Sequence, residues 1–147
     1  MATFTFFDAF KQYMGGGATP DMDLSTDSFV MYLSNDAPVV ATDETITDVP
    51  AITEQNGYTE TALTTTWEET GASTGIWRLV NNADVSWTAS GGSFGPFQYV
   101  VVYNTTLTSP ADLLVGYWDN GSATTIADGN TFNVDLDANF TLFTFDG

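Results

Sequence analysis

The chain has 147 residues, of which 19 are Asp or Glu and two are Lys or Arg, so its formal net charge is −17. Two cations cannot supply the phosphate contacts that nucleic-acid binding requires, and the same charge repels anionic membranes. The sequence has no histidine and no cysteine, which excludes histidine-based triads, thiol nucleophiles, ordinary zinc sites and disulfides. With 43% hydrophobic residues it is typical of a folded domain rather than a disordered acidic tail.

No targeting or membrane segment is expected at the start of the chain. The first residues lack the basic region of a signal peptide, and Asp8 interrupts their apolar run. No stretch approaches the ~20 apolar residues of a transmembrane helix. We therefore expect a protein that is made in a cytoplasm and that needs neither membrane, nucleic acid, metal nor cofactor.

Residues 3–14 are predicted to form one short amphipathic helix. Aromatic residues recur there at helical spacing, Thr5 and Asp8 resemble a capping box, and glycines at 15–17 end the segment. The predicted apolar side consists of Phe6, Phe7, Phe10, Tyr13 and Met14. Two interpretations fit this pattern: a helix packed on its own domain, or an arm at residues 1–17 that docks on a partner.

Alternating oxygen-bearing residues precede the first long strand. Asp21, Asp23, Ser25 and Asp27 resemble the start of a calcium loop, but Thr26 stands where that loop needs glycine. A solvated approach to a strand is the favoured interpretation, with a calcium site as the alternative.

Residues 28–34 are predicted to form a strand that is apolar on both sides. A polar, turn-rich surface excursion follows at 35–57, with a helical turn expected near 49–54. Excursions of this length are usually either functional or poorly ordered.

Two segments between 97 and 120 are rich in β-branched and aromatic residues and predict a central pair of strands. We expect Phe97, Tyr99, Val101 and Tyr103 to face one way and Val100 and Val102 the other. In the second strand, Leu113, Val115 and Tyr117 would oppose Leu114 and Trp118. Because both strands are apolar on both faces, some part of the protein or of a partner must cover each face.

The remaining segments from residue 58 onward are short strands separated by turn signals, including Asn120-Gly121 and 128–130. About seven to nine strands at this spacing predict an all-β antiparallel sandwich or jelly roll. The sandwich would form one domain at 18–147 that includes the 35–57 excursion.

Few carboxylates are arranged as catalytic or metal-binding groups would be. Glu68 and Glu69 are neighbours in a predicted strand and therefore point to opposite faces. Asp135, Asp137 and Asn139 would share one strand face, which is a cation-site alternative to an ordinary solvated face. We therefore expect a non-enzymatic protein, with a polysaccharide hydrolase as a weaker alternative.

The four tryptophans suggest two different roles. Trp87 and Trp118 lie in apolar strands and are expected in the core. Trp67 and Trp77 flank a glycine-containing loop and are the candidates for exposure, where sugar rings could stack on them.

Four groups of segments resemble the head decoration, or cement, proteins of tailed bacteriophages. They are the helix ending in glycines with the strand at 28–34; Glu-Gln-Asn-Gly-Tyr-Thr at 54–59 with Ala-Leu at 62–63; the strands at 85–87, 98–104 and 114–119; and residues 126–137 with the Phe/Thr-rich segment that follows.

This resemblance implies a virion structural protein on the outer capsid surface, often a homotrimer, that ties major capsid subunits together. Contacts to capsid or to neighbouring copies are expected from the 35–57 excursion or from Phe4, Phe6, Phe7, Phe10 and Tyr13. Some of Tyr99, Val101, Tyr103, Val115 and Tyr117 would lie in a subunit interface or beneath the helix. A host-binding module that presents Trp67 and Trp77 to glycans, or a tail or neck location, is the alternative.

Overall fold

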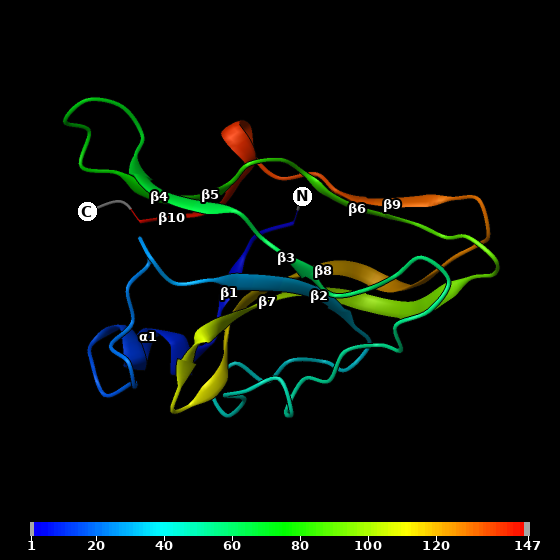
Figure 1. Cartoon of the computed structure of the whole chain (residues 1–147), viewed down its shortest axis with the longest axis horizontal. Coiled ribbons are helices and arrows are strands. Elements are labelled where there is room, and N and C mark those ends of the chain that lie inside the picture. The colour runs from blue at the N-terminus through cyan, green and yellow to red at the C-terminus, as the bar shows by residue number, and fades with distance from the viewer. Residues whose placement is uncertain (1, 146–147) are drawn as a thin grey trace.

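A five-stranded antiparallel sheet forms the middle layer of the computed structural model, which describes residues 2–145. The strand order is β1-β8-β7-β2-β3. Their bounds are β1 Thr5–Phe6, β2 Phe29–Ser34, β3 Thr61–Ala62, β7 Phe94–Thr108 and β8 Ala111–Ile126. Figure 1 shows this sheet between an upper layer of strands and a lower layer of irregular chain.

The upper layer consists of two smaller antiparallel sheets with the orders β10-β5-β4 and β6-β9. The strands are β4 Thr65–Glu69, β5 Trp77–Asn81, β6 Val85–Thr88, β9 Thr131–Val134 and β10 Thr141–Phe145, with a short 3₁₀ turn η1 at Ala138–Phe140. Strands make up 47% of the structure and helix 7%, which confirms the predicted all-β sandwich with one short helix.

The sandwich core lies between the two layers and is rich in aromatic side chains. Fully buried members include Phe10, Phe29, Met31, Leu33, Leu79, Phe94, Phe97 and Val102. Trp87 and Trp118 belong to this core, as predicted, and are 4% and 3% exposed. The prediction was based on the apolar residues that flank each tryptophan in its strand, since such a strand must be buried on at least one face.

The long hairpin of β7 and β8 is interrupted by four shifts of register, and the one after Val102 alters which residues of β8 share a face. Val102 is opposite Gly116 while Tyr103 is opposite Leu114, so Val115 is an extra residue in β8. A single extra residue reverses the side-chain alternation beyond it. As a result Val115 and Trp118 face the sandwich core, whereas Leu114 and Tyr117 face the opposite side.

The second irregularity lies where the sequence predicted a tight turn at Asn120-Gly121. Phe97 is opposite Thr124 and Tyr99 is opposite Asp119, so β8 continues through this stretch with several unmatched residues. The Asp119 carboxylate accepts the Gly121 amide at 2.7 Å, which gives the stretch its local turn without ending the strand. Phe97 lies in the core with Val100, whereas Tyr99 packs on the outer face, so the predicted alignment of Phe97 with Tyr99 is wrong.

The 35–57 segment covers the face of the five-stranded sheet that points away from the upper layer, which we call the outer face (Figure 1). Val49 is fully buried there, and the Ile52 amide bonds to the Leu33 carbonyl at 2.9 Å. Leu114 donates to the Glu44 carbonyl at 2.9 Å, so the segment also pairs with β8. The expected helical turn at 49–54 does not form, because these residues run as an extended cover.

The predicted helix at 3–14 is divided into β1 and the helix α1, Asp8–Met14. Phe7 occupies the N-cap with an extended backbone and no side-chain cap, so the predicted capping box at Thr5 and Asp8 is not formed. Thr5 instead pairs with Tyr117 at the edge of the sheet. No helix among residues 2–145 has the length and apolarity needed to cross a bilayer.

Candidate functional site

A group of tyrosines on the outer face is the most concentrated set of chemically distinctive side chains. Tyr32 from β2 and Tyr103 from β7 lie edge-to-face with ring centroids 5.5 Å apart. The Tyr32 hydroxyl donates to the Val49 carbonyl at 2.6 Å, which anchors the 35–57 segment. Burial raises the pKa of both phenols well above the ordinary value, so they remain neutral donors.

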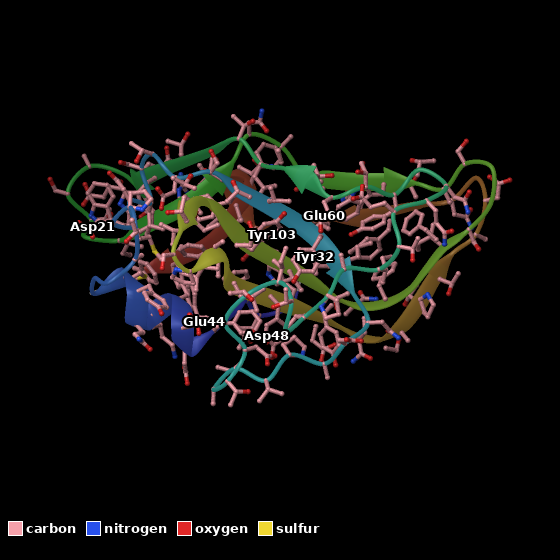
Figure 2. All side chains as sticks on the ribbon, turned by 60° about the horizontal axis from the view of Figure 1, so that its bottom comes forward. Asp21, Tyr32, Glu44, Asp48, Glu60 and Tyr103 are labelled. Carbon is pink, nitrogen blue, oxygen red and sulfur yellow. The ribbon has the colours of Figure 1, made fainter. Side chains whose placement is uncertain are left out.

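Glu60 lies beside this pair, at the point where the chain returns to the sheet (Figure 2). The Tyr103 hydroxyl donates to Glu60 Oε2 at 3.1 Å. Burial raises the pKa of Glu60, and the carboxylates of Glu54 and Asp112 raise it further, against the lowering effect of the Tyr103 hydrogen bond. The ionised form of Glu60 therefore costs stability in the folded protein.

We expect Glu60→Gln to stabilise the protein at pH 7. The pKa of Glu60 is higher in the folded protein than in the unfolded chain. Folding is therefore most favourable at low pH, where Glu60 is protonated in both states, and the protein loses this part of its stability as pH rises through the folded pKa. Glutamine is neutral at every pH, and its amide oxygen can still accept from Tyr103. Urea unfolding at pH 7 and pH 4 measures the effect, which should disappear at the lower pH.

The control for Glu60→Gln is Asp135→Asn, because removing any negative charge lowers the general repulsion in this protein. Asp135 is exposed, so this variant reports that general effect alone. Equal stabilisation by the two substitutions would contradict a specific cost at Glu60.

Tyr99 and Tyr117 form the open end of the outer face. Their rings are 5.9 Å apart at 76°, and both side chains are only partly buried. The hydroxyls of Tyr32 and Tyr103 are hydrogen-bonded within the chain, whereas neither Tyr99 nor Tyr117 makes such a bond to residues 2–145. An amphipathic ring with a free hydroxyl is a frequent component of protein interfaces.

Both cations of the chain are already paired with carboxylates. Lys11 Nζ lies 2.6 Å from Asp8 Oδ1, and Arg78 donates through Nε and Nη2 to Glu68 Oε1 at 3.0 and 2.6 Å. No other carboxylate in the described part of the chain, residues 2–145, is paired with a lysine or arginine, so the protein surface is predominantly anionic. Like charges at this density repel each other and oppose folding.

We expect the melting temperature at pH 7 to rise by several degrees between about 0.05 and 1 M NaCl, because the screening length falls to about 3 Å. The two surface ion pairs that salt weakens contribute only about 0–1 kcal/mol each. Calorimetry at both salt concentrations measures the shift. The control is the same pair of scans near pH 4.1, the calculated pI, where the salt effect should be small. A melting temperature that falls with salt at pH 7 would contradict this expectation.

The predicted calcium-like residues at 21–27 serve the local fold. The Asp23 carboxylate accepts from the amide and hydroxyl of Ser25, and these bonds lower its pKa. Asp27 is 7% exposed and accepts from the Asp23 amide and from Asn104. Among residues 2–145 no three potential ligands are grouped as a metal site requires.

The proposed strand face of Asp135, Asp137 and Asn139 is not formed. β9 ends at Val134, and Asn139 lies within η1 with a positive φ of 60°. Glu68 and Glu69 do diverge as predicted: Glu68 binds Arg78, while Glu69 accepts the Gly75 amide at 2.6 Å and closes the loop between β4 and β5.

Trp67 and Trp77 form a stacked pair at the end of the upper layer. Their ring centroids are 5.8 Å apart at 23°, and Phe145 packs edge-on against Trp67. Trp77 is 41% exposed, which agrees with its predicted accessibility, whereas Trp67 is partly buried by its neighbours. Only one flat indole is therefore well presented to solvent.

The structure separates the other predicted contact residues into two groups. Phe7, Phe10, Val101 and Val115 are fully buried within the chain, and Tyr103 is 6% exposed. Their apolar surface is used by the fold itself: Phe10 and Val115 belong to the sandwich core, and the others cluster on the outer face with residues of the 35–57 segment. The partly exposed group consists of Phe4, Phe6, Tyr13, Tyr99 and Tyr117.

The contribution of Glu60 and Tyr32 to this face was missed from the sequence. The available signal was Asn56-Gly57, whose turn docks against 88–93: the Ser90 amide bonds to the Asn56 carbonyl, and Asn56 Nδ2 to the Ser93 carbonyl at 2.7 Å. A Cβ on Gly57 would lie 2.1 Å from the Thr88 carbonyl oxygen, so only glycine permits this approach.

Comparison with known proteins gives no further guide to function: no protein-family model matches the chain, and no curated protein or solved structure is significantly similar to it. The functional argument therefore rests on the residue patterns and on the geometry of these surfaces.

Proposed function

We propose that this protein is a virion structural protein that decorates the outer surface of a capsid and contacts major capsid subunits through the open end of its outer face. The observation that carries the proposal is the pair Tyr99–Tyr117, partly exposed beside a sheet face that the chain otherwise covers itself. The resemblance of the sequence to head decoration proteins supplies the class of partner.

The charge of the protein supports an outer location. A net charge of −17 with both cations paired is repelled by packaged nucleic acid and favours the side of a shell that faces water. The same charge favours a partner surface with basic residues, because complementary potentials accelerate association and fix orientation.

The two tyrosines of the open end also suit protein binding. Tyrosines offer large contact area with few rotatable bonds, so that ordering them on binding costs little entropy. Self-assembly, as in the homotrimer implied by the resemblance, would use additional surface such as the exposed Met14 and Val39.

Co-sedimentation with capsid shells that lack the protein tests the proposal. Wild type should bind the shells, and Tyr99→Ala combined with Tyr117→Ala should weaken binding at least tenfold, since interface tyrosines often contribute 1–2 kcal/mol or more each. Trp77→Ala is the matched control, because it removes an exposed aromatic from the other layer and should leave binding unchanged. A monomer in sedimentation equilibrium that has no affinity for shells would overturn the proposal.

A host-binding role is the second candidate, favoured by the 41% exposure of Trp77 and its stacking on Trp67. Sugar rings bind such flat aromatic surfaces. A glycan array with wild type and Trp77→Ala distinguishes the two roles: specific glycan binding lost in the variant supports this candidate, and uniform inactivity rejects it.

A further inference from the structure

A cavity of about 300 Å³ opens where the N-terminal arm meets the last strand. Its walls come from three parts of the chain: residues 2–6, Trp118 of β8, and the segment from Asp137 to Thr144 that includes the start of β10. This volume is at the lower end of the range of small-ligand sites and suits a body of amino-acid size. The cavity is separate from the tyrosines of the outer face, because Trp118 and Phe143 belong to the sandwich core.

Aromatic rings form the apolar part of the cavity. Phe4 lies edge-to-face with Trp118 at 4.7 Å between centroids and stacks on Phe143 at 5.4 Å. Phe6 lies edge-to-face with Phe143 at 4.9 Å. These contacts hold the rings in fixed orientations, so the wall is formed before any ligand arrives.

Asp137 is the one charged side chain among the described residues that line the cavity. Its position is fixed by the turn that follows β9: its carbonyl accepts the Thr141 amide at 3.2 Å, and the Thr141 hydroxyl bonds to the Ala138 carbonyl at 2.7 Å. The only lysine and the only arginine of the chain are paired with Asp8 and Glu68. Among residues 2–145, Asp137 therefore has no lysine or arginine to pair with.

We propose that this cavity binds an organic cation: a guanidinium or ammonium group near Asp137, joined to an apolar body that lies against Phe4, Phe6 and Phe143. Charge complementarity carries the assignment, since a carboxylate beside aromatic rings attracts a cation both directly and through the ring quadrupoles. Two sources share this chemistry, an arginine side chain of a protein partner and a free small amine. The proposal does not depend on the capsid role.

The test is an amide NMR titration of the full chain with butylguanidine and with its neutral isostere butylurea. Butylguanidine should give saturable shifts at Trp118, Asp137 and Thr144, and butylurea should bind at least fivefold more weakly. Asp137→Asn should remove this preference, and the control Asp135→Asn, the same change at a nearby exposed carboxylate outside the cavity, should keep it. Both positions are exposed, and the amide spectrum of each variant verifies its fold.

A capped arginine peptide distinguishes the two sources. Binding as tight as that of butylguanidine assigns the site to a partner's side chain, whereas binding of butylguanidine alone assigns it to a free amine. Shifts that do not saturate, that spread over the acidic surface, or that respond equally to the two aspartate substitutions would overturn the proposal. Equal affinity for butylurea would do the same.

Discussion

Asn104→Leu is expected to lower the free energy of unfolding by about 3–5 kcal/mol, because three hydrogen-bonding groups lose their partner at once. Asn104 is fully buried in β7, where the ladder with β8 is interrupted. Its Oδ1 accepts the amides of Thr106 and Leu107 at 2.8 and 3.4 Å. Its Nδ2 donates to Asp27 Oδ2 at 2.8 Å.

Leucine branches at Cγ as asparagine does, but it is larger and offers neither a donor nor an acceptor. The substitution leaves two backbone amides without this acceptor. It also removes one of the two hydrogen bonds that the buried Asp27 carboxylate accepts, so that only the bond from the Asp23 amide remains. The hydrogen bonds of Asn104 therefore connect the 21–27 segment to the irregular end of the β7–β8 hairpin. For a chain of this size the melting temperature should fall by roughly 10–15 °C.

Asn133→Leu is the matched control for this prediction. It makes the same chemical change at an exposed position in β9 and should alter stability by no more than about 0.5 kcal/mol. Urea unfolding of the two variants gives the comparison. A loss at Asn104 below 1 kcal/mol would mean that water replaces the side chain, contrary to the buried geometry.

Gly116→Ala is expected to displace the N-terminal arm from the sheet and to destabilise the protein by about 1–3 kcal/mol. A Cβ at this position would lie 2.4 Å from the Phe4 ring and 2.6 Å from the Thr5 carbonyl oxygen. The ring could turn aside, but the carbonyl belongs to the backbone that pairs β1 with β8. The arm must therefore move, and the aromatic contacts of Phe4 and Phe6 move with it.

Hydrogen exchange measures the displacement directly. The Phe7 amide, which donates to the Val115 carbonyl at 3.2 Å, should lose protection in Gly116→Ala while the amides at the centre of β7 keep theirs. Gly15→Ala is the control: its φ is −79°, and its nearest neighbour would be the Gln12 carbonyl oxygen at 3.3 Å. If Gly116→Ala kept normal protection at Phe7, the close approach of arm and sheet would be contradicted.

The arm also connects the two proposals made above. It supplies Phe4 and Phe6 to the cavity wall, so Gly116→Ala should weaken butylguanidine binding together with Phe7 protection. The arm also contacts the open end of the outer face, because Thr5 pairs with Tyr117 and the Phe7 ring lies 5.5 Å from the Tyr117 ring. Its displacement in Gly116→Ala should therefore weaken capsid binding as well.

The sequence by itself determined the class of fold and the kinds of chemistry available. β-Branched and aromatic residues at short, regular spacing predicted an all-β sandwich, and that class depends on local preference and burial alone. The count of charged residues, with neither histidine nor cysteine, determined the surface potential and excluded several kinds of site. The prediction that both faces of the central strands need a cover was also correct, as the two apolar clusters around them show.

Only the tertiary structure decided which residues share a face and what covers them. The extra residue at Val115 and the unmatched stretch opposite Gln98 arise from pairing between two strands, and no single strand encodes them. The cover of the outer face comes from 35–57, because Val49 and the return of the chain at Glu60 reach Tyr32 and Tyr103 across long sequence separations. Contacts between residues so far apart in the sequence depend on the tertiary arrangement of the whole chain, and the local spacing of apolar residues gives no information about them.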